Sequence, residues 1–210
     1  MFFSYTDKRY NQYSSFLKNK FNAKIYKVTL DAGFNCPNRD GTKSSGGCIF
    51  CDDSGSFSQA HDNLLSVEKQ LETGINRLKK RFKAEKFISY FQAYTNTYGD
   101  IEHLKNIYNS AFSHPDVIGM SIGTRPDCVD KEKIELIASY AKNHYVWMEY
   151  GLQSAHNKTL QTINRGHSFE DFVNAVEITK GHNINICAHV ILGLPDETKE
   201  DMLETASILS

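Results

Sequence analysis

Three cysteines near the start of the chain have the residue type and spacing of a metal site. Cys36, Cys48 and Cys51 read C-x11-C-x2-C within the string CPNRDGTKSSGGCIFC. A closed structural zinc site takes four protein ligands, so three thiolates leave it one ligand short. An iron–sulfur cube contains four irons, and three cysteines leave one of them open to a ligand that is not protein. An open iron beside a substrate pocket indicates catalysis rather than architecture.

A zinc ion with a fourth ligand from elsewhere in the chain is the alternative. The candidates for that ligand are His61, Cys128 and Cys187. The two cysteines follow or belong to other strands, whereas structural zinc usually draws on paired local ligands. The loop that carries the first three cysteines is rich in Gly, Asn, Asp and Pro. Such a loop can wrap a cluster and turn backbone N–H groups toward its sulfurs.

The composition is that of an ordinary globular protein. The chain has 210 residues, a net charge of −1 and five cysteines, an odd number. Because the net charge is near zero, it gives no support to DNA or another polyanion as a partner. The sequence shows no secretory signal and no apolar run of membrane-spanning length, so we expect no membrane association. We therefore predict a cytoplasmic protein whose cysteines are reduced thiols or metal ligands.

The elements that must position these residues alternate between strands and helices. Apolar runs predict five strands, at residues 24–30, 86–92, 117–122, 145–150 and 184–192. Amphipathic periodicity and capping residues predict helices at residues 64–82, 100–112, 130–142, 168–181 and from 198 onward. This alternation predicts a parallel sheet with right-handed crossovers, and hence an α/β fold.

A partial (βα) TIM-type barrel fits this pattern better than a dinucleotide-binding fold, because no G-x-G-x-x-G string follows the first strand. Chemistry in such barrels lies on the loops after the strands. We expect residues 1–22 to form a helical N-terminal extension and residues 23–210 to form the barrel. Five strand–helix units do not close a barrel, and the last helix should still be running at Ser210. We therefore expect an incomplete barrel that lacks its C-terminal part.

Six strings lie at strand ends or in the loops that follow them. They are AGFNCPNRDGT, YFQAYTNTY, GTRPDC, EYGLQS, NRGH and HVILGLPDET. In order, and over essentially the whole chain, they resemble the bacterial YhcC/YtqA-type proteins of the radical S-adenosylmethionine (SAM) superfamily. The string CIFC resembles the C-x-Φ-C end of the superfamily's cluster motif, although the first spacing is eleven residues here and three in most members.

The resemblance implies a [4Fe–4S] cluster held by Cys36, Cys48 and Cys51. SAM would bind the open iron through its amino and carboxylate groups, and an electron donor such as flavodoxin or ferredoxin would reduce the cluster. One electron would then cleave SAM to a 5′-deoxyadenosyl radical, which takes a hydrogen atom from the substrate. The cofactor performs this chemistry, and the protein positions it and excludes water.

The same resemblance implies a set of SAM-binding residues. They are Phe50, Gln92, Tyr94, Asn96, Glu149, Gln153, Arg165, Leu192 and Gly193. Phe50 is the aromatic residue before the last cysteine of the motif. Gln92, Tyr94 and Asn96 lie where other members carry a Gly-Gly-Glu string that holds the SAM amino group. The acidic residue of that string is absent here, so amide, hydroxyl and carbonyl groups would have to replace it.

The other predicted SAM contacts come from later strand ends. Glu149 and Gln153 belong to an E-x-G-x-Q-S pattern that also resembles the elongator catalytic subunit and oxygen-independent coproporphyrinogen oxidase, and by that likeness they bind the ribose. Side chains alternate along a strand, so both residues share one face. Arg165 would face the SAM carboxylate, because a guanidinium matches carboxylate geometry. Gly193 would let the backbone approach adenine, and Leu192 or Leu194 would cover its face.

Plainer roles stay open for these residues. The polar strand end at Gln92 can simply contact water, and Glu149 can form a structural ion pair. Arg165 can be a solvated residue of the loop before a helix. Gly193 can serve only the tight turn after the strand.

Four more residues near strand ends have alternative interpretations. Arg125 and Asp127, in the string GTRPD, contact the substrate or SAM, or else form a salt bridge with each other. Cys128 is either a thiol on the substrate side or, more simply, a small buried residue. Cys187 lies in an apolar strand and is predicted to be core. No role is assigned to His61, His167 and His189.

The resemblance also implies a substrate class. For YtqA-type proteins the associated activity is maturation of the wobble uridine of tRNA, in which a carboxymethylaminomethyl group becomes aminomethyl. A basic run at residues 77–86 is either a solvated helix end that suits the helix dipole or a contact for RNA phosphates. Two alternative functions stay open. The chain can be a radical SAM enzyme that acts on a small metabolite, or a non-enzymatic zinc or iron–sulfur module.

Overall fold

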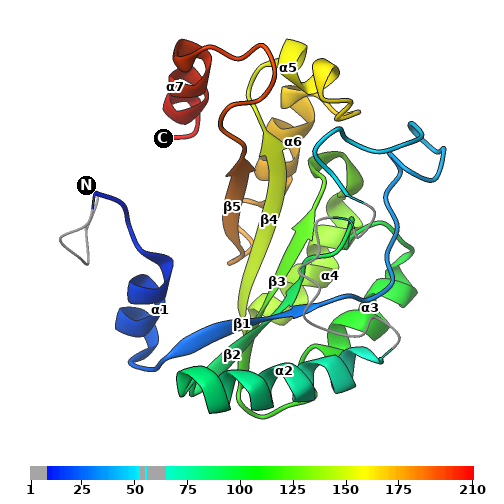
Figure 1. Ribbon diagram of the computed structural model, residues 1–210. Helices are drawn as coiled ribbons and strands as arrows, with labels where there is room; N and C mark the ends of the chain where they lie inside the picture. Colours follow the sequence, from blue (N-terminus) through cyan, green and yellow to red (C-terminus); the bar gives the residue numbers. More distant parts are fainter. Residues whose placement is uncertain (1–8, 53–54, 56–64) are drawn as a thin grey trace.

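Figure 1 shows the computed structural model of the chain, which describes residues 9–52, 55 and 65–210. Its centre is one sheet of five strands in the order β1-β2-β3-β4-β5. The strands are β1 (Ile25–Leu30), β2 (Lys86–Phe91), β3 (Val117–Thr124), β4 (Tyr145–Gln153) and β5 (Asn185–Val190). Every neighbouring pair is parallel. The predicted α/β fold of alternating strands and helices is therefore confirmed.

Helices connect the strands and follow the last one. They are α1 (Tyr13–Phe21), α2 (Val67–Phe82), α3 (Ile101–Ser110), α4 (Lys131–Ala141), α5 (Asn157–Thr162), α6 (Phe169–Thr179) and α7 (Lys199–Ile208). Neither α5 nor the short 3-10 turn η1 (Pro126–Cys128) is among the elements predicted from the sequence. Residue 64, the predicted start of the second helix, lies outside the described residues.

The predicted helix starts have the expected capping contacts. The carboxylate of Asp100 accepts from the backbone N–H of His103, and Asp130 caps α4 in the same way. At the start of α6, Ser168 and Asp171 form a complete capping box, and Thr198 with Asp201 forms a second one at α7. Because these contacts satisfy N–H groups that have no partner within the helix, they fix where each helix begins.

The two faces of the sheet have different environments. On the face toward the helices, alternate strand residues join one apolar core with α2 and its neighbours, as Leu30, Met120 and Tyr150 illustrate. On the opposite, inner face, Ile25 of β1 and Ile88 of β2 pack against Leu17 of α1. The helix α1 therefore covers the inner face near the amino ends of the strands and leaves their carboxyl ends accessible (Figure 1).

The N-terminal helix falls within the predicted extension, although residues 1–8 of that prediction lie outside the described residues. At the other side of the sheet, β5 is less buried than the inner strands, and Val190 at its end is 39% exposed.

No helix among the described residues is both long and apolar enough to cross a lipid bilayer.

Candidate functional site

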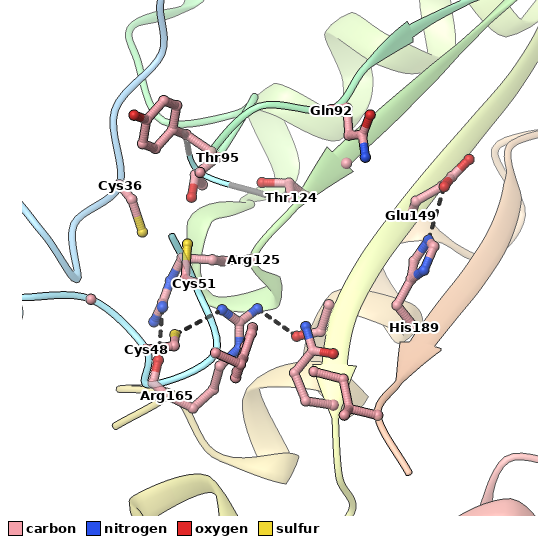
Figure 2. Close-up of a pocket in the computed structure, with 18 of the residues that line it drawn as sticks. Cys36, Cys48, Cys51, Gln92, Thr95, Thr124, Arg125, Glu149, Arg165 and His189 are labelled. Carbon is pink, nitrogen blue, oxygen red and sulfur yellow. Dashed lines mark hydrogen bonds and ion pairs between the residues drawn. The ribbon is translucent and has the colours of Figure 1, made fainter. Parts of the chain in front are cut away.

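A pocket of about 340 Å³ opens where the five strands end. Most of the predicted site residues line it, and Figure 2 shows their side chains around one space. They are Cys36, Cys48, Phe50, Cys51, Gln92, Tyr94, Glu149, Gln153 and Arg165. Parallel strands place their carboxyl ends at one edge of a sheet, which explains how residues so far apart in sequence meet here.

The cysteine loop turns back on itself through backbone hydrogen bonds. The N–H of Arg39 donates to the carbonyl of Cys36 at 2.8 Å, and the N–H of Cys51 donates to the carbonyl of Cys48 at 3.0 Å. Gly47 adopts a φ of +78°, a conformation that favours glycine. These turns bring all three cysteines to the wall of the same pocket.

Cationic and amide donors surround two of the sulfurs. Arg39 places Nη1 3.4 Å from the Sγ of Cys51, and Arg165 places Nη1 3.5 Å from the Sγ of Cys48. Asn38 adds an amide donor 3.5 Å from the same Cys48 sulfur. N–H donors of this kind hydrogen-bond to the sulfur ligands of iron–sulfur clusters and tune the cluster's reduction potential. The loop therefore has donors suited to a cluster held by these sulfurs.

The spacing of the sulfurs does not match a single zinc ion. Among the described residues, the one group of three ligand atoms from His, Cys, Asp or Glu within 4.8 Å of one another is His156, Asp201 and Glu204. Zn–S bonds of about 2.3 Å in a tetrahedron would bring sulfurs to within about 3.8 Å of each other. The three cysteine sulfurs are thus more widely spread than a mononuclear site requires.

Neither described candidate for a fourth zinc ligand lines the pocket. Cys128 is 8% exposed, and burial, followed by the charge of Asp127, raises the pKa of its thiol to about 12. Cys187 lies in β5 with its Sγ 3.9 Å from the Nε2 of His189. The third candidate, His61, lies outside the described residues.

Arg165 is a buried cation at the centre of the site rather than a solvated loop residue. It is 7% exposed, and its Nη2 donates to the carbonyl of Gly151 at 2.6 Å. A Cβ on Gly151 would lie 2.7 Å from that Nη2 atom, so a larger residue there would force the guanidinium to move. The Nε of Arg165 is buried and has no hydrogen-bond partner among the described residues. A bound anion could satisfy that donor.

Arg125 and Asp127 form the mutual salt bridge that was one of their two predicted roles. Arg125 donates through Nε and Nη2 to the carboxylate of Asp127, both at 2.9 Å, and the two side chains are 2% and 3% exposed. Burial opposes ionisation, but the bonds from Arg125 outweigh it and lower the pKa of Asp127 to about 2. Arg125 also donates to the carbonyl of Arg165 at 2.7 Å and thereby fixes the backbone of that residue.

Glu149 forms the structural ion pair that was left open as an alternative to ribose binding. Its Oε1 accepts from Lys27 and from Ser121, and its Oε2 lies 2.9 Å from the Nε2 of His189. Burial alone would raise the pKa of Glu149, yet the bond from His189 and the charge of Lys27 lower it to about 2. The carboxylate is therefore ionised and already bound to partners from three other strands.

The segment after β2 differs in part from its predicted role. Gln92 and Tyr94 line the pocket, and Tyr94 has a φ of +60° with its ring against Gly55. Asn96 does not line the pocket, because its amide donates to the carbonyls of Phe91 and Gly123 and holds the loop in place.

The predicted adenine contacts also lie outside the main pocket. Leu192 is 71% exposed and lines a separate small groove that includes Gln153 and Met202. Gly193 does not line either cavity, and its N–H lies 3.2 Å from the sulfur of Met202. The strand β5 ends at Val190, two residues earlier than predicted, so this segment turns away from the pocket. The φ of +80° at Gly193 agrees with the tight turn that was its alternative role.

Sequence reasoning missed several lining residues. Tyr90, Thr95, Thr124 and His189 all line the pocket, and the hydroxyl of Thr95 is buried with no hydrogen-bond partner from the described residues. The available signal was a polar side chain on the inner face of each otherwise apolar strand. Reading that signal requires knowledge of which face of each strand points inward.

A family match agrees with this geometry. Residues 36–209 match the Radical SAM superfamily. YtqA of Bacillus subtilis (strain 168) is 40% identical over 208 residues, which are 99% of this chain and 65% of YtqA. MJ0486 of Methanocaldococcus jannaschii is 45% identical over 206 residues, or 95% of this chain and 61% of MJ0486. The chain therefore spans slightly less than two thirds of the length of these relatives.

Shorter and more distant likenesses point to the same fold. The tRNA uridine(34) acetyltransferase of Methanocaldococcus infernus is 32% identical over 84 residues, which are 40% of this chain and 15% of that protein. The structure of M. infernus Elp3 lacking residues 1–46 superposes with a TM-score of 0.58 at 19% identity, and covers 88% of this chain and 42% of that chain. At that identity the likeness shows the fold, which is the partial barrel of radical SAM enzymes. With a family match along most of its length and close relatives across nearly all of it, the chain belongs to the radical SAM superfamily of enzymes.

Proposed function

We propose that the chain is the core of an enzyme that converts the carboxymethylaminomethyl group on the wobble uridine of tRNA to aminomethyl. The observation that carries this proposal is the 84-residue similarity to tRNA uridine(34) acetyltransferase, whose name specifies the same uridine. The fold likeness to Elp3 supports a common architecture. The substrate has a C–H bond between an amine and a carboxylate, and both groups stabilise a carbon radical formed by loss of a hydrogen atom there.

The pocket residues fit the cofactors that the superfamily uses. Three thiols line one pocket, and their spread exceeds that of a single ion. Two buried polar atoms in the pocket, the Nε of Arg165 and the hydroxyl of Thr95, have no partner in the part of the chain that the structure describes. We infer that Cys36, Cys48 and Cys51 hold a [4Fe–4S] cluster and that SAM binds next to it. Together these groups supply a 5′-deoxyadenosyl radical when the cluster is reduced.

The side chains of the pocket then have distinct tasks. Arg165 binds the SAM carboxylate, because it is the buried guanidinium nearest the cysteine loop. Gln153 binds the ribose, and Gln92 and Tyr94 contact the amino end. Phe50 covers one side and excludes water. Contact between adenine and the segment of Leu192 and Gly193 stays a prediction, since that segment lies outside the main pocket.

Nucleoside analysis of tRNA tests the substrate. We expect tRNA from a strain in which the full-length gene is deleted to accumulate carboxymethylaminomethyluridine at position 34 and to lose its aminomethyl derivatives. A plasmid copy of the gene should restore them, whereas a copy with Cys48→Ala should not. An unchanged nucleoside profile in the deletion strain would contradict the tRNA proposal.

A small metabolite is the second candidate substrate, and one observation favours it. The basic run at residues 77–86 ends α2 and begins β2, so it lies at the amino ends of the strands, opposite the pocket. Within it, Lys79 and Lys86 form ion pairs with Asp116 at 2.8 and 2.9 Å. The run therefore does not line the pocket, and two of its lysines are already paired within the chain. Affinity for bulk tRNA that does not change with salt concentration would favour the metabolite.

A further inference from the structure

A cluster of polar side chains occupies the inner face of the sheet at one end of the pocket. The inner-face cluster consists of Lys27, Tyr90, Ser121, Glu149 and His189, one residue from each strand. Tyr90, Glu149 and His189 line the pocket itself. Figure 2 shows Glu149 and His189 side by side, away from the three cysteines. The pocket therefore has a cysteine end and a second, chemically different end.

Within the cluster, Glu149 serves to hold cations rather than to face a ligand. It is 3% exposed, and both of its oxygens accept from partners within the chain. Lys27, one of these partners, also lies 4.3 Å above the ring of Tyr90. A buried carboxylate with three donors has little capacity left for a ribose.

The charges of the cluster do not cancel. Lys27 and His189 both bind Glu149, and the described residues give these cations no second carboxylate. The hydrogen bond to Cys187 and the bond to Glu149 raise the pKa of His189 to about 9, so its ring is protonated at neutral pH. Burial raises the pKa of Tyr13 and of Tyr90, which keeps both neighbouring hydroxyls neutral. The cluster therefore carries one net positive charge.

His189 is the member that can present this charge to a ligand. Its side chain is 47% exposed and lines the pocket, whereas Glu149 is almost fully enclosed. Its Nε2 is engaged with Glu149, and within the described chain no hydrogen bond uses its Nδ1. A protonated imidazole donates from both nitrogens, so Nδ1 remains a charged donor.

We propose that this end of the pocket binds a carboxylate group of the substrate, with His189 as the donor and Lys27 with Glu149 as its charged support. One excess positive charge matches a monoanion. This inference rests on the proposed function, in which the substrate carries a carboxylate on the carbon next to its amine. If that carboxylate is anchored away from the cysteines, the carbon between the carboxylate and the amine would lie between the cysteine end of the pocket and the other end.

Binding of matched RNAs tests the proposal. Two anticodon stem-loops that differ only at position 34, with a carboxymethylaminomethyl or an aminomethyl group, are titrated into the reconstituted, SAM-loaded full-length protein. We expect the wild type to prefer the carboxylate form by about 10-fold or more, the effect of a charge-assisted hydrogen bond. His189→Gln should remove this preference without weakening the aminomethyl RNA, and the control His182→Gln should keep it. A preference that survives His189→Gln in protein with normal iron content would overturn the proposal.

A second measurement separates this site from the tRNA assignment. Protein labelled with ¹³C at the histidine Cε1 is titrated with sodium acetate, sodium phosphate or sodium chloride, and the signal of His189 is identified by its loss in His189→Gln. We expect a saturable shift with acetate and none with chloride. That shift, together with failure to modify tRNA, would retain the anion site and reject the tRNA function. No acetate response in an enzyme that does modify tRNA would reject the site alone.

Discussion

At the scale of single residues, the arginines beside the cysteine sulfurs govern how easily a bound cluster accepts an electron. Arg39 lies 3.4 Å from the Sγ of Cys51 and also donates to the carbonyl of Asp52. A positive charge there stabilises the reduced, more negative cluster, so its loss lowers the reduction potential. We expect Arg39→Met to lower the potential of the reconstituted cluster in a redox titration monitored by electron paramagnetic resonance.

The control for that experiment is Arg81→Met. Arg81 lies over the ring of Phe82 in the last turn of α2, at the opposite edge of the sheet. The substitution Arg81→Met should leave the reduction potential of the cluster unchanged. A potential that stays the same or rises in Arg39→Met would show that this guanidinium does not act on the cluster.

Gly151 makes room for the guanidinium that we assign to SAM. An added methyl group would lie 2.7 Å from the Nη2 of Arg165 and 2.7 Å from the Nε2 of Gln153. We expect Gly151→Ala to weaken SAM binding by about 10-fold or more, because a hydrogen bond to a charged group contributes about 1.5–3 kcal/mol. Overpacking should also lower the free energy of unfolding by about 1–3 kcal/mol.

Calorimetric titration with SAM and chemical denaturation measure these two effects. Gly99→Ala is the matched control, since its methyl group would come no closer than 3.3 Å to another side chain and Gly99 lies outside the pocket. Equal losses of SAM affinity in the two variants would contradict the assigned role of Arg165.

At the scale of elements, the capping box of α6 sets the geometry of the loop that carries Arg165. Ser168 accepts from the N–H of Asp171, and Asp171 accepts from the N–H of Ser168 at 2.8 Å. We expect Ser168→Ala to lower the free energy of unfolding by about 1 kcal/mol, because it leaves an N–H of the first turn without a partner. Urea denaturation measures this loss. Ser113→Ala, at an exposed position after α3, should change the free energy by less than about 0.5 kcal/mol.

Comparison of the helices and strands with their predicted bounds shows which of them could be predicted from the sequence. The strands and helix caps were predictable because each depends on residues close in sequence, as at Asp100 and Ser168. The helix α5 was missed because its six residues are too short to show an apolar stripe. The strand β4 ends at Gln153, later than the predicted end at residue 150. The sequence could not show this, because the register shift between Gly151 and Gln153 depends on pairing with β5.

Some residues of the candidate site could likewise be predicted from the sequence, and others could not. The cysteines were predictable from spacing, and most of the proposed SAM contacts were predictable from resemblance to a family. The inner-face cluster was not, because Lys27 and His189 are unremarkable single residues until the sheet brings them to Glu149. The resemblance implies that Leu192 covers adenine; it lies beyond the end of the fifth strand at Val190 and outside the main pocket, so this contact stays a prediction.

At the scale of the whole molecule, buried ion pairs predict how stability depends on pH. The pKa values of Glu149 and Asp127 are lowered to about 2 from ordinary values of 4.5 and 3.8. Their stabilising effect is present above the ordinary values and is lost as pH falls toward 2. The pKa of His189 is raised to about 9 from 6.5, so its effect is complete below 6.5 and is lost as pH rises through 9.

We therefore expect the urea midpoint of unfolding to be highest between about pH 5 and 6.5 and to fall on both sides. His189→Gln should reduce the fall on the alkaline side and, because the bond from His189 helps to lower the pKa of Glu149, should also reduce part of the fall on the acid side. A midpoint that keeps rising from pH 6.5 to 9 in the wild type would contradict the assigned charges of the inner-face cluster.

The central claim is that three thiolates hold a cluster with one iron left for SAM. The most direct test is anaerobic reconstitution of the full-length protein with iron and sulfide, followed by reduction and measurement of 5′-deoxyadenosine formed from SAM. We expect about four irons per chain and SAM cleavage, both lost on Cys36→Ala, Cys48→Ala or Cys51→Ala and both retained in Cys187→Ala. A protein that binds one zinc ion and leaves SAM intact would contradict the claim.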